Sequence, residues 1–393
     1  MPAWMDDELN ERRSRGLYRS RRELASAQGA RVRVRGRDLV NFSSNDYLGL
    51  AADPRLARAA ARAARRYGCG AGASPLVSGH LRPLRLLERD LAAWEGTEAA
   101  LVFPSGYAAN LAAVSTLAGR DDAVFSDELN HASLIDGCRL SRAGVFVYRH
   151  RDLDHLHDLL HHEGPATRRR LIVTDSVFSM DGDLAPLAGL IDLARRHDAL
   201  LLIDEAHATG VLGESGRGLT DLLPPGEGER DRLVKVGTLS KALGAQGGFV
   251  CGSRRLIDYL VNCARPYIFS TALAPPVAAA AREAVALVIA EPERRRRVLT
   301  LAEQLRSGLR ALGRPANNSS CQIVPVIVGD ATAAVGLSEQ LEERGLLVPA
   351  IRPPSVPEGT ARLRISLTAG HTEEDVRRLL EALADLPWPV GSL

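Results

Sequence analysis

The sequence is nearly devoid of lysine. Of its 50 basic residues, only Lys235 and Lys241 are lysines, and the others are arginines. Arginine cannot replace lysine where chemistry needs a nucleophilic amine, because its guanidinium stays protonated. Any reaction that uses a side-chain primary amine therefore has only two candidates here. A general preference for arginine would explain the same count without any chemistry.

Paired cysteines and long apolar runs are also missing. The absence of a CxxC pair excludes the common zinc spacings and a disulfide framework, and we expect no metal site. An odd number of cysteines favours a reducing compartment. The N-terminus has no apolar signal region, acidic residues 6–8 argue against a transit peptide, and no run is long enough to cross a membrane. We therefore expect a cytoplasmic protein. The five cysteines are Cys69, Cys138, Cys251, Cys263 and Cys321.

An excess of charge of either sign is absent as well. The formal net charge is +2 for 393 residues, so the composition offers no overall case for binding nucleic acid or a membrane. The basic stretch 12–22 is a local exception, which fits either a solvated helix face or a binding patch. The length predicts two domains with a short appendage.

Three regions follow from the patterning along the chain. Residues 1–44 form an N-terminal region, with a polar helix over 6–27, strands over 30–34 and 38–42, and a turn at Gly36. Residues 45–275 form a large domain, and residues 276–393 a smaller α+β domain that begins after Pro275-Pro276. Residues 224–229 are expected to be a surface loop.

The large domain alternates apolar strand-like runs with helical patterns. Such alternation predicts an α/β fold with a mainly parallel seven-stranded sheet and helices on both faces. The helix over 186–197 is the clearest. The expected strands are 99–103, 122–126, 145–148, 170–175, 199–204, 233–237 and 248–252.

The smaller domain is expected to combine long helices with two strands. The final helix, 373–386, has a good N-terminal signal, because Thr372 is followed by Asp375 three residues later. The other expected elements are helices over 277–290, 293–312 and 332–344 and strands over 323–328 and 363–367.

An acidic residue follows the most apolar expected strand. Residues 200–203 are all apolar and lead directly into Asp204, which is typical of a buried parallel strand at its carboxyl end. Ligands bind at that edge of open α/β sheets. An acid there can keep a pyridine nitrogen protonated, and His207 lies close enough to reach the same ligand. The alternative is an aspartate that only caps the next turn.

Lys241 follows the end of another expected strand. It lies in a loop of small and hydroxyl residues in which Thr238 and Ser240 can bind a phosphate, and glycines 244, 247 and 248 allow close approach of a ligand. Lys235, in contrast, lies between two valines within the strand. A lone loop lysine is often merely solvated, but the strand-end Asp204 favours a functional role for Lys241.

Two further segments offer binding groups. Ser105 and Gly106 stand between a strand and an alanine-rich helix, where free backbone N–H groups can bind phosphate, although an ordinary turn has the same pattern. His131, in a later loop, could stack on an aromatic ring. Residues 68–73 match the G-x-G-x-x-A dinucleotide motif, but they follow a helical stretch instead of a strand, so we interpret them as a loop.

Together these segments resemble the α-oxoamine synthases of the fold-type I pyridoxal-phosphate superfamily, from about residue 40 to 370. Many separate blocks in the same order make this resemblance specific. The blocks are residues 41–50, 105–107, 130–134, 177–183, 204–207 and 238–241, with 351–357 and 359–364 near the C-terminus.

The resemblance implies roles for individual residues. Lys241 would bind the cofactor as a Schiff base, Asp204 would pair with its pyridine nitrogen, and His207 and His131 would contact the ring. The other implied cofactor-binding residues are Ser105, Gly106, Tyr107, Ser179, Thr238 and Ser240, with Thr271 reaching the phosphate of a partner subunit.

The C-terminal blocks are similar to those of family members that condense L-alanine with a pimeloyl thioester in biotin biosynthesis. The donor would be the coenzyme A or the acyl-carrier-protein thioester. Arg364 would then bind the amino-acid carboxylate with Asn45 nearby, while Arg19, Arg352 and Ser355 would contact the acyl substrate. His131 would also contact the substrate.

The resemblance further implies a homodimer with its active sites at the subunit interface. Two alternatives stay open at this point. One is another α-oxoamine synthase, such as a glycine C-acetyltransferase. The other is a binding or regulatory module that kept the fold and lost the catalysis.

Overall fold

The computed structural model describes residues 3–164, 166–223, 230–314 and 318–388. The expected surface loop at 224–229 lies outside these residues. The chain forms two compact units. The large unit comprises Leu50–Phe178 and Leu184–Arg295, and the small unit comprises Met1–Gly49, Ser179–Asp183 and Arg296–Leu393. Among the described residues, no helix combines the length and the apolar character needed to span a bilayer.

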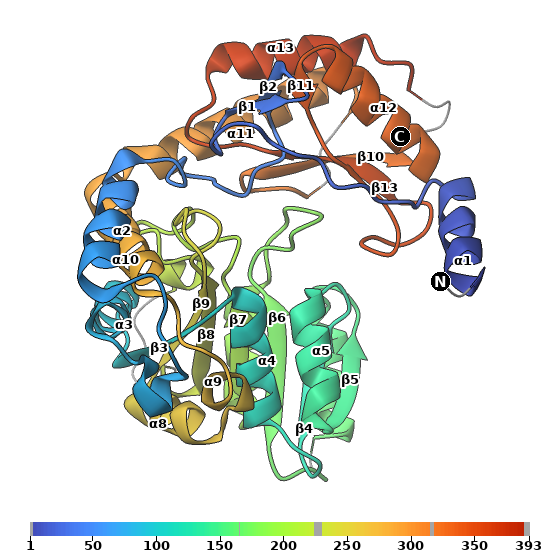
Figure 1. Cartoon of the computed structure of the whole chain (residues 1–393). Helices are drawn as coiled ribbons and strands as arrows, with labels where there is room; N and C mark the ends of the chain where they lie inside the picture. Colours follow the sequence, from blue (N-terminus) through green and yellow to red (C-terminus); the bar gives the residue numbers. More distant parts are fainter. Residues whose placement is uncertain (1–2, 165, 224–229, 315–317, 389–393) are drawn as a thin grey trace. The chain divides into compact units, whose positions relative to one another are not determined.

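A seven-stranded sheet is the centre of the large unit (Figure 1). The order is β3-β9-β8-β7-β6-β4-β5, in which β9 is antiparallel to both neighbours and all other pairs are parallel. All seven expected strands are confirmed, as is the mainly parallel sheet. The strands are β3 (Ala99–Phe103), β4 (Ala123–Asp127), β5 (Gly144–Tyr148), β6 (Arg170–Asp175), β7 (Leu200–Asp204), β8 (Leu233–Thr238) and β9 (Gly248–Gly252).

Helices cover this sheet. Helix α4 is apolar on nearly all sides, and its alanines 109, 112 and 113 are fully buried in a core with residues of β3, β6, β7 and β8. A helix that is apolar all round is expected to be buried in this way. The helices are α2 (Pro54–Tyr67), α3 (Arg82–Glu95), α4 (Gly106–Leu117), α5 (Ala132–Ser141), α6 (Leu153–His162), α7 (Leu187–Arg196), α8 (Arg254–Cys263), α9 (Arg265–Ile268) and α10 (Pro275–Ala290), with short turns at Pro75–Gly79, Leu219–Leu222 and Arg230–Arg232.

Helix α10 belongs to the large unit, because it packs against α2 and α3. Its two prolines occupy the first helical turn, where a missing N–H group costs nothing, so the Pro-Pro pair begins a helix. The border of the large unit falls later, within α11 (Glu293–Ala311). The predicted domain boundaries, 1–44, 45–275 and 276–393, stay a prediction.

The small unit contains two three-stranded sheets. One has the order β1-β2-β11, and the other, β10-β13-β12, is antiparallel and packs against α12. The expected capping box of the last helix is present, since Thr372 and Asp375 bind each other's backbone N–H groups. The elements are β1 (Arg31–Val34), β2 (Arg37–Asn41), β10 (Ile323–Gly329), α12 (Ala331–Glu343), β11 (Leu346–Leu347), β12 (Ala350–Ile351), β13 (Ala361–Ser366) and α13 (Glu373–Ala384).

The expected helix over 6–27 is wrong in its second half. Helix α1 spans Ala3–Ser14. It is terminated by Gly16, whose φ of 65° is left-handed. The Gly16 N–H binds the Arg13 carbonyl at 3.1 Å, and the Leu17 N–H binds the Arg12 carbonyl at 2.8 Å. This pattern terminates a helix and favours glycine. The residues after it are not helical, and the Ala25 N–H binds the Arg33 carbonyl at 2.8 Å.

Candidate active site

Three neighbouring strands of the large unit end in polar residues. Asp175 ends β6, Asp204 ends β7, and Thr238 ends β8. Because these strands are parallel, their carboxyl ends lie at one edge of the sheet, and Asp175 and Asp204 are direct partners in the ladder. Both carboxylates are buried, at 3% and 4% exposed. The edge therefore collects two acids and the start of the loop that carries Lys241.

Asp204 is held by hydrogen bonds on both of its oxygens. Oδ1 accepts the N–H of Ala206 at 2.8 Å, and Oδ2 accepts Nδ2 of Asn110 at 2.6 Å. His207, three residues later, is also buried. A buried carboxylate fixed from two sides can offer its remaining lone pairs to a cationic nitrogen of a ligand.

Lys241 is half-buried in the loop after β8. The loop is closed by backbone hydrogen bonds from Leu239 to Gly247 at 2.9 Å and from Gly244 to Lys241 at 2.9 Å. His131 lies near enough to feel its charge. The side chain of His131 is exposed, yet partial loss of hydration lowers its pKa; Asp204 acts against this shift and Lys241 adds to it. Three of the predicted residues are thus grouped at one edge.

The start of α4 and the loop after β8 form a small cradle. Ser105 caps α4, with its hydroxyl accepting the Ala108 N–H at 3.1 Å, and the first N–H groups of a helix have no partner within it. A side chain at Gly106 would lie 3.1 Å from Thr238 Oγ1, so the two segments nearly touch. Thr238 Oγ1 lies 2.8 Å from Ser240 Oγ. This set of hydroxyl and N–H donors suits a phosphate.

The predicted cofactor residues Tyr107 and Thr271 also belong to the large unit. The Tyr107 hydroxyl, on an exposed side chain, donates to the Asp136 carboxylate, which raises the pKa of Tyr107. Thr271 is exposed in the loop between α9 and α10. Their expected roles stay predictions.

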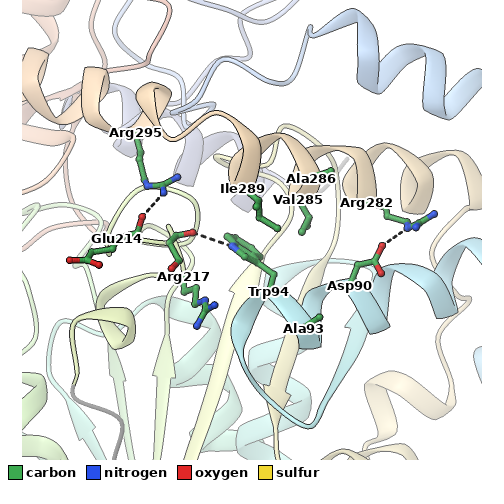
Figure 2. A pocket seen from close by; sticks show the side chains of 11 residues that line it. Asp90, Ala93, Trp94, Glu214, Arg217, Arg282, Val285, Ala286, Ile289 and Arg295 are labelled. Carbon is green, nitrogen blue, oxygen red and sulfur yellow. Dashed lines mark hydrogen bonds and ion pairs between the residues drawn. The ribbon is translucent and has the colours of Figure 1, made fainter.

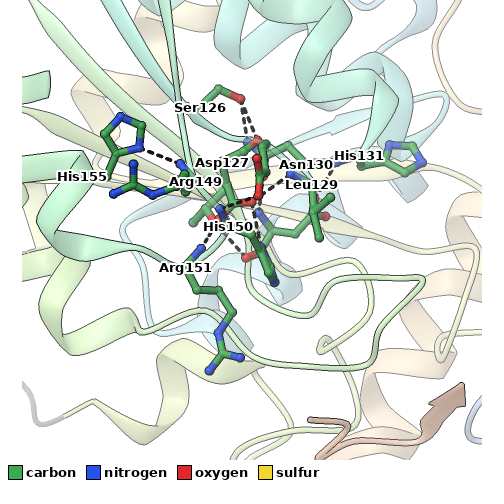
Figure 3. Close-up of polar contacts among 12 residues, drawn as sticks. Ser126, Asp127, Leu129, Asn130, His131, Arg149, His150, Arg151 and His155 are labelled. Carbon is green, nitrogen blue, oxygen red and sulfur yellow. Dashed lines mark hydrogen bonds and ion pairs between the residues drawn. The ribbon is translucent and has the colours of Figure 1, made fainter. Parts of the chain in front are cut away.

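The loop that carries His131 is fastened to the strands beside it (Figure 3). The Asp127 carboxylate accepts the Leu129 N–H, the Arg151 N–H and Nδ1 of His150, each at 2.9 Å. The His131 N–H donates to Asp175 Oδ2 at 2.7 Å. In Figure 3 the His131 ring points away from the Asp127 carboxylate, so the anchoring leaves this ring accessible.

Asn110, Asn130, Ser133 and Asp175 are polar residues of this edge that the sequence did not single out. Asn130 Nδ2 donates to the Val173 carbonyl at 2.8 Å, and its Oδ1 accepts the Asp175 N–H at 3.0 Å. Burial raises the pKa of Asp175 well above its usual value, and the charge of Asp204 raises it further. One signal was available, because Asp175 also ends an apolar strand, as Asp204 does.

The small unit holds a second group of predicted residues around Arg364. Its Nε donates to the Ser179 carbonyl at 2.5 Å, and its Nη1 donates to Ser366 Oγ at 2.9 Å and Asn45 Oδ1 at 3.3 Å. Arg364 is 5% exposed and lies on β13. Burial raises the pKa of the neighbouring Tyr47, whose hydroxyl donates to Asn45, to about 12. The guanidinium is therefore fixed by neutral acceptors, which leave its charge available to a carboxylate.

The remaining predicted substrate residues lie elsewhere in the small unit. Arg19 donates to the Pro353 carbonyl at 3.3 Å, and Arg352 donates to the Tyr18 carbonyl at 2.6 Å. Partial burial lowers the pKa of Arg352, and the charge of the nearby Arg19 lowers it further. Ser355 is exposed in the same segment. Within the described ranges neither arginine has an acidic partner, and two positive charges side by side would suit an anionic group.

A pocket of about 530 Å³ lies in another part of the large unit (Figure 2). It is lined by residues of α3, α10 and the segment 214–217 and by Arg295 of α11, and by none of the predicted site residues. An ion pair between Arg282 and Asp90 and a 3.1 Å hydrogen bond from Trp94 Nε1 to the Ser215 carbonyl hold its walls. We assign no function to it.

The fold and the strand-end lysine and acid define a known class of protein. A family model described as aminotransferase class I and II matches residues 37–383, and the chain belongs to this family. The fold resemblance expected from the sequence is confirmed.

Curated relatives narrow the comparison further. An 8-amino-7-oxononanoate synthase of Anaeromyxobacter sp. (strain Fw109-5) is 56% identical, covering 98% of this chain and 95% of the relative. The protein of that name from Anaeromyxobacter dehalogenans (strain 2CP-1 / ATCC BAA-258) is 52% identical, with 99% and 97% covered. A third, from Geobacter sulfurreducens, is 50% identical, with 98% of each chain covered.

Solved structures agree on the fold. A serine palmitoyltransferase from Sphingomonas wittichii matches with a TM-score of 0.90 at 31% identity, covering 97% of this chain and 96% of that chain. A structure described as SPT with PLP has a TM-score of 0.91 at 32% identity, with the same coverage. An 8-amino-7-oxononanoate synthase from Francisella tularensis has a TM-score of 0.75 at 28% identity, with 88% and 97% covered.

Proposed function

We propose that the protein condenses L-alanine with a pimeloyl thioester to give 8-amino-7-oxononanoate, carbon dioxide and a free thiol, as a step of biotin biosynthesis. The observation that carries the chemistry is the grouping of Lys241, His131 and Asp204 at one edge of the sheet. The substrates are supported by the shared name of relatives that are 50–56% identical over nearly the whole chain.

Pyridoxal phosphate is the cofactor of this fold family, and the residues at the sheet edge fit it. The cradle of Ser105, Gly106 and Thr238 offers several donors at a helix start, as a phosphate requires. The buried Asp204 can hold a proton on a pyridine nitrogen, and the exposed ring of His131 can stack on an aromatic plane. When bound, the cofactor supplies an electron sink for charge that develops on the amino-acid substrate.

The protein's own groups would then divide the work. The Lys241 amine would hold the cofactor and would take the proton from the Cα atom of bound L-alanine. Arg364 pairs with the alanine carboxylate through its planar fork, which selects the bond to be broken, and Asn45 stands beside it. Arg19, Arg352 and Ser355 contact the acyl substrate. His207, Tyr107, Ser179, Ser240 and Thr271 contribute to cofactor binding as expected above.

The test is a panel of amino acids against acyl thioesters. The enzyme with added pyridoxal phosphate is incubated with L-alanine, glycine or L-serine and with pimeloyl-, acetyl- or palmitoyl-coenzyme A, and free thiol is followed. We expect L-alanine with the pimeloyl thioester to exceed every other pair. Preference for glycine with the acetyl thioester would replace the proposal by a glycine C-acetyltransferase. Release from no pair, with no absorption change on adding L-alanine, would favour a binding module.

Two finer points belong to the same proposal. Pimeloyl-acyl carrier protein is tested beside pimeloyl-coenzyme A, and the better donor identifies the partner. A homodimer with sites at the subunit interface and a cytoplasmic location are also proposed. Mixing two inactive variants, one altered at Lys241 and one at Thr271, would restore part of the activity if a partner subunit completes each site.

A further inference from the structure

A chain of hydrogen bonds joins His131 to Asp204 within the large unit. Nδ2 of Asn110, on α4, donates to Asp204 Oδ2 at 2.6 Å and to Ser133 Oγ at 2.9 Å. Ser133 Oγ in turn lies 2.7 Å from Nδ1 of His131. Asn110 is 2% exposed and Ser133 is fully buried, so water cannot easily substitute for either.

The direction of each hydrogen bond follows from its neighbours. The Asn110 amide must present its NH₂ group to Asp204, because the reversed amide would place an oxygen against a carboxylate. The same NH₂ group also donates to Ser133, whose hydroxyl proton is then free to donate to His131. The Ser133 N–H donates to His131 Nδ1 at 3.2 Å as well. Nδ1 therefore carries a lone pair, and the proton of the neutral ring is on Nε2.

The backbone of His131 is held separately from its ring. Its N–H donates to Asp175 Oδ2 at 2.7 Å, and Asn130 ties the same loop to β6. Removing the Ser133 hydroxyl would therefore leave the loop anchored, while the ring nitrogen would keep only the longer hydrogen bond from the backbone N–H of residue 133. This separation makes a specific effect on the ring distinguishable from a general loss of structure.

We propose that Asn110 and Ser133 are positioning residues, which fix His131 as the neutral Nε2–H tautomer and tie its ring to the Asp204 carboxylate. The functional part of this inference rests on the proposed cofactor chemistry. A neutral His131 leaves the charge of Asp204 to the cofactor's ring nitrogen, because a cationic imidazole nearby would compete for it. The Nε2–H group becomes a donor toward a substrate oxygen.

The charged groups that act on His131 are Asp204, Lys241 and Asp136. The Ser133→Ala substitution removes none of them. Any change in the titration of His131 in that variant therefore reports the lost hydrogen bond, and not a lost charge.

The experiment is NMR of the full chain labelled with ¹⁵N- and ¹³C-histidine, with and without added pyridoxal phosphate. His131→Asn identifies the signal. We expect wild-type His131 to be the Nε2–H tautomer at neutral pH. Ser133→Ala is expected to raise the pKa of His131 by about 0.5–1 unit, the size of one hydrogen bond, while the remaining backbone N–H of residue 133 still favours the Nε2–H tautomer. Asn110→Ala should shift it less, and Ser133→Thr should restore it.

The matched control is Ser141→Ala, on the same helix. Its hydroxyl donates to the Cys138 carbonyl at 2.6 Å and is not part of the chain. We expect Ser141→Ala to leave the His131 signal unchanged. An equal shift in both variants would overturn the inference.

A second readout is the dissociation constant of pyridoxal phosphate, which we expect Ser133→Ala to weaken several-fold and Ser141→Ala to leave alone. A wild-type His131 that is the Nδ1–H tautomer or a cation at neutral pH overturns the inference, even if no variant folds. A wild-type protein with the expected tautomer that binds no pyridoxal phosphate overturns the proposed function and not the hydrogen-bond chain.

Discussion

The two lysines of this chain lie in the same strand-and-loop segment and have opposite surroundings. Lys235, within β8, is 4% exposed, and its ammonium forms an ion pair with Glu95 and donates to the Arg217 carbonyl. Lys241, six residues later, is half-buried in the loop beyond the strand end. Position along this segment thus decides whether an amine is buried in an ion pair of the core or lies at the strand-end edge beside Asp204.

The electrostatics of the locked pair explain why it is structural. Burial raises the pKa of Glu95 to about 7, against the pull of Lys235. Burial acts to lower the pKa of Lys235, but Glu95 and Glu205 outweigh it and the net shift is upward. An ammonium held this firmly is not a nucleophile. We therefore expect substitution of Lys241 to affect activity and substitution of Lys235 to affect stability.

Lys241→Ala is expected to abolish thiol release and the visible absorption of the bound cofactor, because it removes the only accessible lysine amine among the described residues. Lys235→Ala should retain both per folded molecule. Absorption spectra and thiol assays on the two variants measure this. Retention of both properties by Lys241→Ala, with their loss in Lys235→Ala, would reverse the assignment of the two lysines.

Lys235→Ala is expected to cost about 3–5 kcal/mol of unfolding free energy, because it leaves a buried carboxyl without its cation. The double variant Lys235→Met/Glu95→Leu should recover most of this loss, since it removes both charges. Urea unfolding followed by circular dichroism gives the values, with Lys241→Ala as the control expected to stay within about 1 kcal/mol of wild type. If Lys235→Ala costs less than about 1 kcal/mol, the ion pair contributes little to the stability of the fold.

Two glycines allow the same comparison between a structural position in the core and a position at the proposed cofactor site. Gly218 has a φ of 101°, and a Cβ there would lie 2.5 Å from the Glu205 carboxylate, so Gly218→Ala should destabilise the protein by about 1–3 kcal/mol. Gly106→Ala would place a methyl group 3.1 Å from Thr238 Oγ1, and should mainly weaken binding of pyridoxal phosphate. Unfolding and cofactor titration of both variants test this. If the two variants changed stability and cofactor affinity equally, the assignment of Gly218 to stability and of Gly106 to cofactor binding would be wrong.

The smallest expected effect is a pH dependence of stability. Between about pH 4.5 and 7 the folded protein retains a proton on Glu95 that the unfolded chain has released, so the stability from this group falls as pH rises through that window. Glu95→Gln should lack this slope. The difference between wild type and variant in unfolding free energy, measured from pH 5 to 8, isolates it. Parallel curves would contradict the raised pKa.

Local patterns were enough to predict the seven strands of the large unit. The seven strands were found because each is a short apolar run between helical or turn residues, and β3, β6 and β9 agree at both ends. The helix over 6–27 failed at Gly16, whose left-handed conformation ends α1. Pro275 and Pro276 were taken as a break, while their place in the first turn of α10 begins a helix.

The site residues divide in the same way. Asp204 and Lys241 were found because each follows a strand end, which is visible in one dimension. Asn110 was missed, because its partner Asp204 is 94 residues away and only the packing of α4 on the sheet brings them together. Ser133 lies in one of the blocks of the resemblance, two residues after His131, but its link to Asn110, 23 residues away, depends on the packing of α4 on α5.

The sequence by itself determined the alternation of strands and helices and the choice of lysine as the amine, because both depend on residue type and spacing. The tertiary structure alone decided that Lys235 is paired with Glu95 and that Asn110 and Ser133 link His131 to Asp204. Those contacts are hydrogen bonds and ion pairs between distant segments. Their geometry exists only once the helices are packed on the sheet.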